Sequence, residues 1–196
     1  MTENVNRLPK KRNFKKYSAE EFFEFTKGRE ERYELIDGQI RLMASPSTKH
    51  QRISRKISNI LSDYFKDKTC EPFYSPLDVV LFQKTKKDDS RNIFQPDIFV
   101  VCDPNKITEK RIVSAPDFII EIVSPSNPED DYIDKLVVYM KYGVREYWIV
   151  NPDTRKILVY IKDKEIFQND AYTFEDKIKV SIFEDLEIDF KNLNLL

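Results

Sequence analysis

The chain has 196 residues, of which 34% are charged and 40% hydrophobic, and its formal net charge is −1. This length fits one domain, and ten tyrosines with fourteen phenylalanines argue against an intrinsically disordered chain. The three glycines lie too far apart for a dinucleotide-binding loop or a P-loop, so no nucleotide cofactor is expected. One histidine and two cysteines exclude zinc fingers and Cys-rich zinc sites, so any metal should be held mainly by oxygen atoms.

Charge is distributed unevenly along the chain. Residues 1–16 carry six basic side chains against one acid, whereas residues 163–196 hold nine acids against four lysines. We expect residues 1–16 to be a flexible basic arm, either a solubilising extension or a phosphate-contacting tail, and residues 17–196 to be a single domain. Without a membrane-spanning run or a signal peptide, we expect a cytoplasmic protein with no membrane contact, in which Cys70 and Cys102 are reduced thiols.

The N-terminal part of the domain predicts a helix followed by a β-hairpin. Ser18 and Glu21 form a capping-box pattern at the start of a short helix. The runs 33–36 and 39–43 flank an Asp-Gly turn, which is typical of a two-residue hairpin connection. Glu34 lies in the first strand of this hairpin.

A longer helix should follow Ser47. Its apolar residues recur at helical spacing, as Ile53, Ile57, Ile60, Leu61 and Tyr64. His50 falls in the first turn of this helix.

The remaining pattern favours a mixed sheet. The runs 77–82, 97–102 and 118–123 show little polar alternation, as in strands buried on both faces. A polar loop over 83–92 separates the first two of these runs. A helix over 128–142 should end at Gly143, followed by strands at 146–150 and 157–161 and shorter ones near 165–168 and 177–180. We therefore predict an α/β (α+β) fold, a mixed central β-sheet flanked by α-helices.

Acidic residues interrupt three of the apolar strands. Glu121 shares a strand face with Ile119, while Asp97 opens a second run and Asp78 interrupts a third. If the strands are neighbours, Asp97 and Glu121 can bind one hard cation such as Mg²⁺ or Mn²⁺, which prefers carboxylate ligands. Each acid also has a simpler explanation: Asp97 caps a turn, Asp78 lies at an edge, or Glu121 pairs with a lysine.

Lys135 is the candidate cation beside such a site. It lies on the helix that follows the Glu121 strand, and a cation there would stabilise charge that develops on a phosphoryl group. The alternative is a surface lysine that pairs with Asp131 four residues earlier.

Five strings in order carry a family resemblance. They are Tyr33 to Ile40 (YELIDGQI), Pro46 to Ile53 (PSTKHQRI), Gln95 to Ile98 (QPDI), Ala115 to Ser126 (APDFIIEIVSPS) and Tyr139 to Pro152 (YMKYGVREYWIVNP). Together they cover roughly residues 20–185, and the chain resembles the Uma-type family of endonucleases in the PD-(D/E)xK, or restriction-endonuclease-like, superfamily.

The resemblance implies metal-dependent hydrolysis of phosphodiester bonds. Asp97 and Glu121 match the two acids that bind Mg²⁺ (or Mn²⁺), and Glu34 matches an N-terminal acid that completes or steers the metal shell. The lysine expected two residues after the second acid is Val123 in this chain, an apolar residue that cannot orient water. Lys135 matches the position to which this family is thought to have moved that lysine, where it would position the attacking water and stabilise the phosphorane.

His50 matches the family string Pro-x-x-x-His, as a contact to the scissile phosphate, a secondary base or a structural hydrogen bonder. Three functions remain open at this point. The first is a Mg²⁺-dependent DNA endonuclease acting as a homodimer, because two symmetric sites can cut both strands. The second, favoured by Val123, is a nucleic-acid-binding protein of the same fold with weak or no activity. The third is an oligomeric scaffold that uses aromatic residues such as Tyr142, Tyr147 and Trp148.

Overall fold

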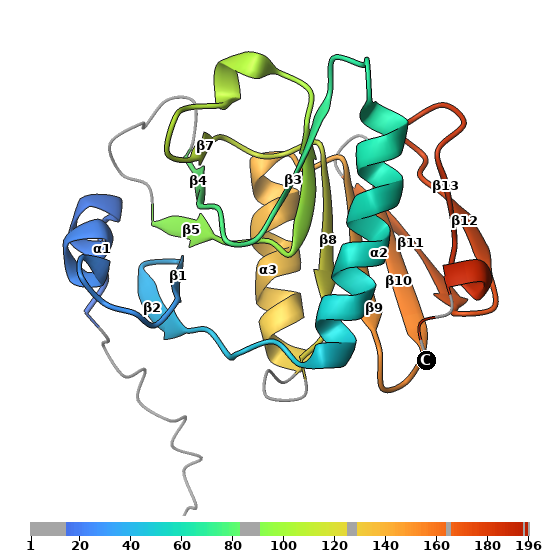
Figure 1. Ribbon diagram of the computed structural model, residues 1–196. Helices are drawn as coiled ribbons and strands as arrows, with labels where there is room; N and C mark the ends of the chain where they lie inside the picture. The colour runs from blue at the N-terminus through green and yellow to red at the C-terminus, as the bar shows by residue number, and fades with distance from the viewer. Residues whose placement is uncertain (1–14, 83–90, 125–128, 164–165, 194, 196) are drawn as a thin grey trace, which may run out of the picture.

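Figure 1 shows the computed structural model, which describes residues 15–82, 91–124, 129–163, 166–193 and 195. The predicted arm over 1–16, apart from Lys15 and Lys16, and most of the predicted loop over 83–92 lie outside the described residues. Among the described helices, none combines the length and the apolar character that crossing a bilayer requires.

The strands form two larger sheets and one small one. The larger sheets have the orders β11-β10-β9-β8-β6-β3 and β2-β1-β5-β4-β7, and β12 pairs with β13. In the first sheet only β8 and β9 run parallel, so this sheet is mixed, as predicted. The strands are β1 (Tyr33–Ile36), β2 (Gln39–Leu42), β3 (Glu71–Tyr74), β4 (Val79–Leu81), β5 (Asn92–Phe94), β6 (Ile98–Val101), β7 (Ile112–Val113), β8 (Phe118–Ile122), β9 (Glu146–Asn151), β10 (Lys156–Asp163), β11 (Ile166–Thr173), β12 (Lys177–Lys179) and β13 (Glu187–Asp189).

The described residues hold three α-helices, α1 (Ala19–Thr26), α2 (Thr48–Phe65) and α3 (Glu129–Tyr142), and two short 3-10 helices, Pro104–Lys106 and Lys191–Leu193. The predicted capping box is present, since Ser18 Oγ accepts a hydrogen bond from the Glu21 backbone and the Glu21 carboxylate accepts one from the Ser18 backbone. The hairpin turn has left-handed φ angles of 47° at Asp37 and 79° at Gly38, which explains the Asp-Gly pair.

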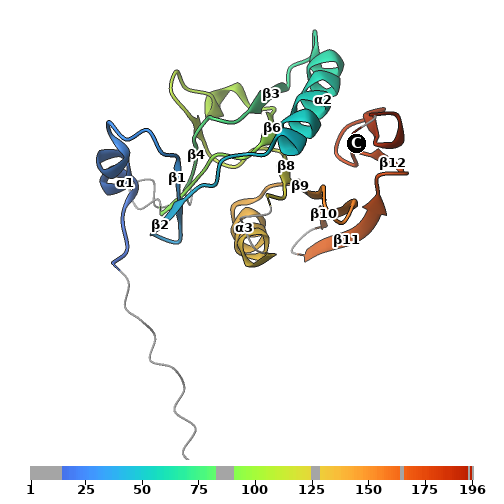
Figure 2. The same cartoon turned by 60° about the horizontal axis from the view of Figure 1, so that its bottom comes forward.

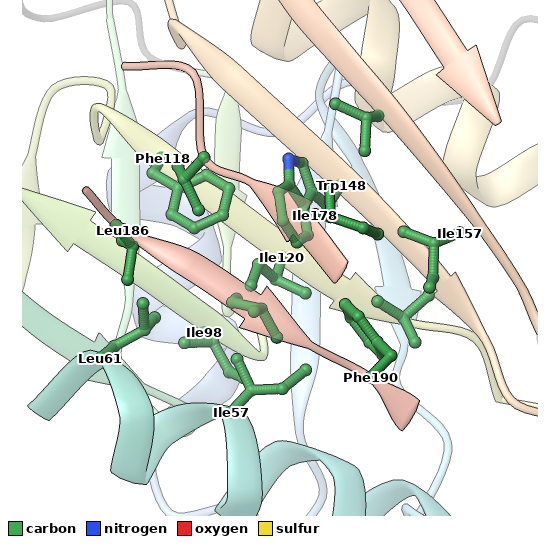
Figure 3. Packing of buried hydrophobic residues seen from close by; sticks show 14 of the residues in the cluster. Ile57, Leu61, Ile98, Phe118, Ile120, Trp148, Ile157, Ile178, Leu186 and Phe190 are labelled. Carbon is green, nitrogen blue, oxygen red and sulfur yellow. The ribbon is translucent and has the colours of Figure 1, made fainter. Parts of the chain in front are cut away.

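Helices α2 and α3 cover opposite faces of the six-stranded sheet (Figures 1 and 2). Ile57 and Leu61 of α2 pack with alternate strand residues such as Ile98, Phe118 and Ile120, as Figure 3 shows. On the other face, Tyr132 and Tyr139 of α3 pack with the intervening residues, among them Phe99, Ile119 and Tyr147. The two-residue period of the strands thus explains why the central strands are apolar on both sides. The predicted fold class is confirmed.

The neighbouring strands β6 and β8 position the two predicted metal ligands. They pair antiparallel, with Ile98 opposite Ile120. Asp97 immediately precedes β6 and therefore lies beside the end of β8. Glu121 lies on the α3 face of β8, because its neighbours Ile120 and Ile122 pack on the α2 face.

One interpretation of the sequence is wrong. Cys70 and Cys102 are not separate thiols but form a disulfide, with Cα atoms 3.9 Å apart. The expectation rested on the absence of export features, and the sequence pattern does not reveal β3, the strand that follows Cys70. Its pairing with β6 sets Glu71 opposite Val101 and so brings the flanking cysteines together.

Candidate active site

A cleft of about 740 Å³ is lined by residues of α2 and of the β1–β2 hairpin, among others. It is lined by all five residues that the sequence suggested for the site, namely Glu34, His50, Asp97, Glu121 and Lys135. Four of these ionisable side chains are buried and form what we call the floor of the cleft: Glu34, His50, Glu121 and Lys135. Residues up to 101 positions apart in the sequence meet here.

Lys135 connects two carboxylates at this floor. Its Nζ lies 3.0 Å from Glu34 Oε2 and 3.2 Å from Glu121 Oε1. Glu34 also accepts a hydrogen bond of 3.0 Å from the Gln95 backbone, and Glu121 Oε1 accepts one of 3.0 Å from the Tyr139 hydroxyl. The ammonium group is therefore fixed by two acids from different strands. The alternative partner considered from the sequence, Asp131, has a side chain outside the described part.

Burial dominates the protonation of Glu121. Desolvation raises the pKa of its carboxyl group to about 8, opposed by the attraction of Lys135 and reinforced by the negative charges of Asp97 and Glu34. A cation bound at this carboxylate would offset the cost of the buried negative charge, but it must first displace the proton.

Asp97 is held by two contacts to one oxygen. Its Oδ2 accepts a hydrogen bond of 2.8 Å from the Ile122 backbone and lies 3.0 Å from His50 Nε2. The other ring nitrogen of His50, Nδ1, is buried without a hydrogen-bond partner among the described residues. His50 thus contacts the carboxylate rather than standing apart from it, and α2 is connected to the start of β6.

The donor atoms of the cleft fit a hard divalent ion. Among the described contacts, Asp97 Oδ1 and Glu121 Oε2 accept no hydrogen bond, so each acid keeps one oxygen for a ligand. Mg²⁺ is commonly bound by one or two carboxylates, with water and substrate phosphate as its other ligands. Within the described residues, no group of three or more His, Cys, Asp or Glu side chains is arranged to hold an ion by itself. Two carboxylates are a ligand set that Mg²⁺ can use when water and substrate phosphate complete its coordination.

The sequence matches a known family over most of its length. The family model Uma2, described as "Putative restriction endonuclease", matches residues 19–191. The chain belongs to the Uma2 family. Two proteins of Synechocystis sp. (strain ATCC 27184 / PCC 6803 / Kazusa) are similar to it. The uncharacterized protein slr1290 is 27% identical over 153 residues, which cover 78% of this chain and 77% of the relative. The uncharacterized protein sll1609 is 25% identical over 148 residues, which cover 74% and 80%.

A solved structure shares the fold of this Uma2 chain. It is the crystal structure of a "putative nuclease belonging to DUF820" from Anabaena variabilis, with a TM-score of 0.74 and 22% sequence identity. The similarity covers 91% of this chain and 99% of the other. The predicted resemblance to the Uma-type, restriction-endonuclease-like family is thus confirmed.

Two residues singled out in the sequence, Asp78 and Val123, lie outside the cleft. Asp78 precedes β4 in the five-stranded sheet and accepts a hydrogen bond of 2.9 Å from the Gln95 side chain, and it does not line the cleft. Val123, at the usual lysine position of the superfamily, is half-buried against the α3 face of the core. Neither residue is among those that line the cleft of this Uma2 protein.

Sequence reasoning missed three side chains that shape the site. Tyr132 and Tyr139 stand on the same face of α3 as Lys135, at a spacing of three and four residues that could have revealed them. Tyr132 accepts a hydrogen bond of 3.0 Å from the Ser124 backbone. Arg32 lines the cleft through contacts to Gln95 and Ser75, and no local pattern announces it.

Proposed function

We propose that this protein is a metal-dependent endonuclease that hydrolyses phosphodiester bonds of DNA. The observation that carries the proposal is the convergence of Asp97 and Glu121 on one cleft, with Lys135 in contact with Glu121. Membership of the Uma2 family and the shared fold of the Anabaena nuclease support the same activity. The composition of the site, two acids and a lysine, suits charge stabilisation at a phosphate.

Asp97 and Glu121 would hold Mg²⁺ or Mn²⁺ through the oxygens that accept no hydrogen bond. The bound ion supplies Lewis-acid stabilisation of the phosphate and lowers the pKa of water. His50 and the Ile122 backbone keep Asp97 oriented. This arrangement explains why Glu121 is kept inside the protein despite the cost of burying its charge.

Lys135 would orient the attacking water and stabilise the negative charge that builds up on the phosphorane. Glu34 fixes its ammonium group by accepting a hydrogen bond of 3.1 Å at Oε1, beside the close contact at Oε2. Glu34 is therefore a positioning residue that acts through Lys135. In the overall reaction one water oxygen bonds to phosphorus and one P–O ester bond breaks, so the products are a phosphate monoester and a free hydroxyl.

The test is cleavage of supercoiled plasmid and of a single-stranded oligonucleotide with Mg²⁺ or Mn²⁺. The wild type should cut, whereas D97A, E121Q and K135A should lose activity by at least about 100-fold, as expected for loss of an electrostatic stabiliser. Glu175→Gln is the matched control, because Glu175 is an exposed acid that pairs with Arg155 outside the cleft. Intact DNA with every protein, or equal cutting by D97A and the wild type, would refute the proposal.

A second function, nucleic-acid binding without turnover, is favoured by one observation. The superfamily lysine position holds Val123, and Lys135 already contacts two carboxylates. Salt-dependent DNA binding by a wild type that never cuts would select this function over the endonuclease.

A further inference from the structure

A second group of side chains lines the same cleft without contacting the acids. We propose that Arg32 and Tyr74 form a subsite for one nucleotide of an unpaired DNA strand, in which Arg32 binds the phosphate and Tyr74 stacks on the base. The inference deepens the proposed function, on which the choice of DNA as ligand rests.

Arg32 is a cation held in place by hydrogen bonds, and no described residue gives it an acidic partner. Its Nε donates a hydrogen bond of 2.8 Å to the Gln95 side chain, and its Nη2 donates one to Ser75 Oγ. Among the described residues no carboxylate forms an ion pair with Arg32, whereas Arg41 in the same cleft pairs with Asp134 at 2.7 Å. A planar guanidinium held in place with its charge not neutralised suits a phosphate oxygen.

Arg32 is linked to the acidic floor but distinct from it. The side chain of Gln95 accepts a hydrogen bond from Arg32, and its backbone N–H donates a hydrogen bond of 3.0 Å to Glu34 Oε1. The chain of contacts places Arg32 beside the floor without any bond to Asp97 or Glu121. A phosphate on Arg32 is therefore a neighbour of the phosphate at the acids.

Tyr74 offers an aromatic face to the cleft. It is the last residue of β3, at the edge of the six-stranded sheet, and 55% of its surface is exposed. Phe73 turns the other way and stacks on Phe99 with ring centroids 5.6 Å apart, so strand alternation directs Tyr74 to the cleft side. Among the described rings none packs against Tyr74. The next residue, Ser75, accepts the hydrogen bond from Arg32, so the two side chains of the proposed subsite are linked through it.

The combination of a cation, Arg32, and an exposed aromatic ring, Tyr74, favours a single-stranded ligand. Aromatic side chains bind single strands by stacking on bases, and a base inside a duplex offers no free face to Tyr74. The cleft volume of about 740 Å³ lies in the range of pockets that enclose single small molecules. A nucleotide that has left the duplex stack fits such a space, with its phosphate on Arg32.

The test measures binding without divalent ions, by fluorescence anisotropy in EDTA. A single-stranded oligonucleotide should bind tighter than the duplex of the same sequence. Arg32→Gln should reduce the slope of log affinity against log salt by about 0.7, the value for one phosphate contact on a single strand, and Arg32→Lys should retain most of it. The control Arg52→Ala removes an exposed arginine of α2 that does not line the cleft, and the slope should stay unchanged.

Tyr74 is tested with a matched pair of variants. Tyr74→Ala should weaken single-strand binding by about tenfold, because it removes one stacked base, whereas Tyr74→Phe keeps the ring and the affinity. Thermal unfolding checks that each variant is folded, and Arg32→Gln retains a side chain able to bond Gln95 or Ser75. Equal slopes for Arg32→Gln and Arg52→Ala, wild-type affinity in Tyr74→Ala, or tighter duplex binding would overturn the inference.

This outcome is separable from that of the proposed function. Binding in EDTA requires no cleavage, so a protein that never cuts DNA can still show the Arg32 and Tyr74 effects. Conversely, a wild type that cuts DNA with Mg²⁺ while both variants bind normally would refute the subsite alone.

Discussion

The Nε2 atom of His50 lies 3.0 Å from Oδ2 of Asp97, inside the protein and at the start of α2. Ser47 caps this helix and its Oγ accepts from the His50 backbone, so the ring is anchored at its own base. Among the roles considered for His50 from the sequence, this contact favours the structural hydrogen bonder. His50 holds the carboxylate that we propose as a metal ligand, and its removal should act through Asp97.

Replacing His50 should weaken metal binding, because His50 orients the carboxylate of Asp97. We expect His50→Ala to lower Mg²⁺ affinity by about tenfold, the usual effect of losing a side chain that orients a metal ligand. His50→Gln should recover much of the affinity, because a glutamine amide can reach Asp97 from the same helix position. Titration calorimetry without DNA measures both. Unchanged affinity in His50→Ala, with a folded protein, would remove the positioning role.

Lys135 should matter to stability as well as to cleavage. Its ammonium group lies between Glu34 and Glu121, all three being buried. Lys135→Met leaves two buried carboxylates without their cation, and we expect a loss of about 3 kcal/mol in the free energy of unfolding. Urea denaturation measures this loss.

A double variant separates the two effects of Lys135. Lys135→Met with Glu34→Gln removes one of the uncompensated acids, so much of the stability should return. Cleavage should stay lost, because no cation remains beside the phosphate. Recovery of cleavage in the double variant would contradict the proposed role of Lys135.

The sequence predicts those parts of the site that disturb a local pattern. Glu121 is visible because a carboxylate interrupts an apolar strand, and Asp97 because it opens another. The contacts between Arg32, Gln95 and Ser75 join residues 63 and 43 positions apart, and no periodicity connects them. The same reason hides the role of Glu34 as a partner of Lys135.

The elements that the sequence predicts are those with a long periodic pattern or a clear turn or capping signal. Helix α2 shows its apolar residues over many turns, and its capping residue Ser47 marks its start. Strands β1 and β2 have only four residues each, but the Asp-Gly turn between them makes the hairpin recognisable, whereas β3 and β5 have four and three residues and no such turn signal. Without β3, nothing in the sequence indicates that Cys70 faces Cys102, and the lack of export features favours reduced thiols.

Metal binding should depend on pH through Glu121. Its pKa of about 8 means that the carboxyl group is protonated below that pH, and a metal ion must displace the proton. We expect Mg²⁺ affinity to rise by up to about tenfold per pH unit between pH 6 and 8 and to level off above. Calorimetry in two buffers of different ionisation enthalpy should show about one proton released per ion near pH 7. An affinity that is flat over this range would contradict the prediction.

A second buried acid, Glu146, should make stability depend on pH away from the cleft. Its carboxylate accepts hydrogen bonds from Trp148 Nε1 at 2.7 Å and from the Ile182 backbone at 3.1 Å. Burial nevertheless raises its pKa from 4.5 to about 7, since these bonds offset only part of the desolvation. The folded state therefore binds more protons than the unfolded state between these values, and its stability falls as pH rises from about 4.5 to 7.

Comparison with Glu146→Gln isolates this contribution, because Glu121 titrates in the same direction in both proteins. The wild type should lose up to about 3 kcal/mol relative to the variant between pH 4.5 and pH 7, with little further change above. The glutamine costs a constant amount, since its amide cannot accept from both donors, but this cost does not vary with pH. Urea unfolding followed by the fluorescence of Trp148, the single tryptophan, measures the difference. A difference that stays constant from pH 5 to pH 7.5 would show that Glu146 is ionised in the folded protein throughout.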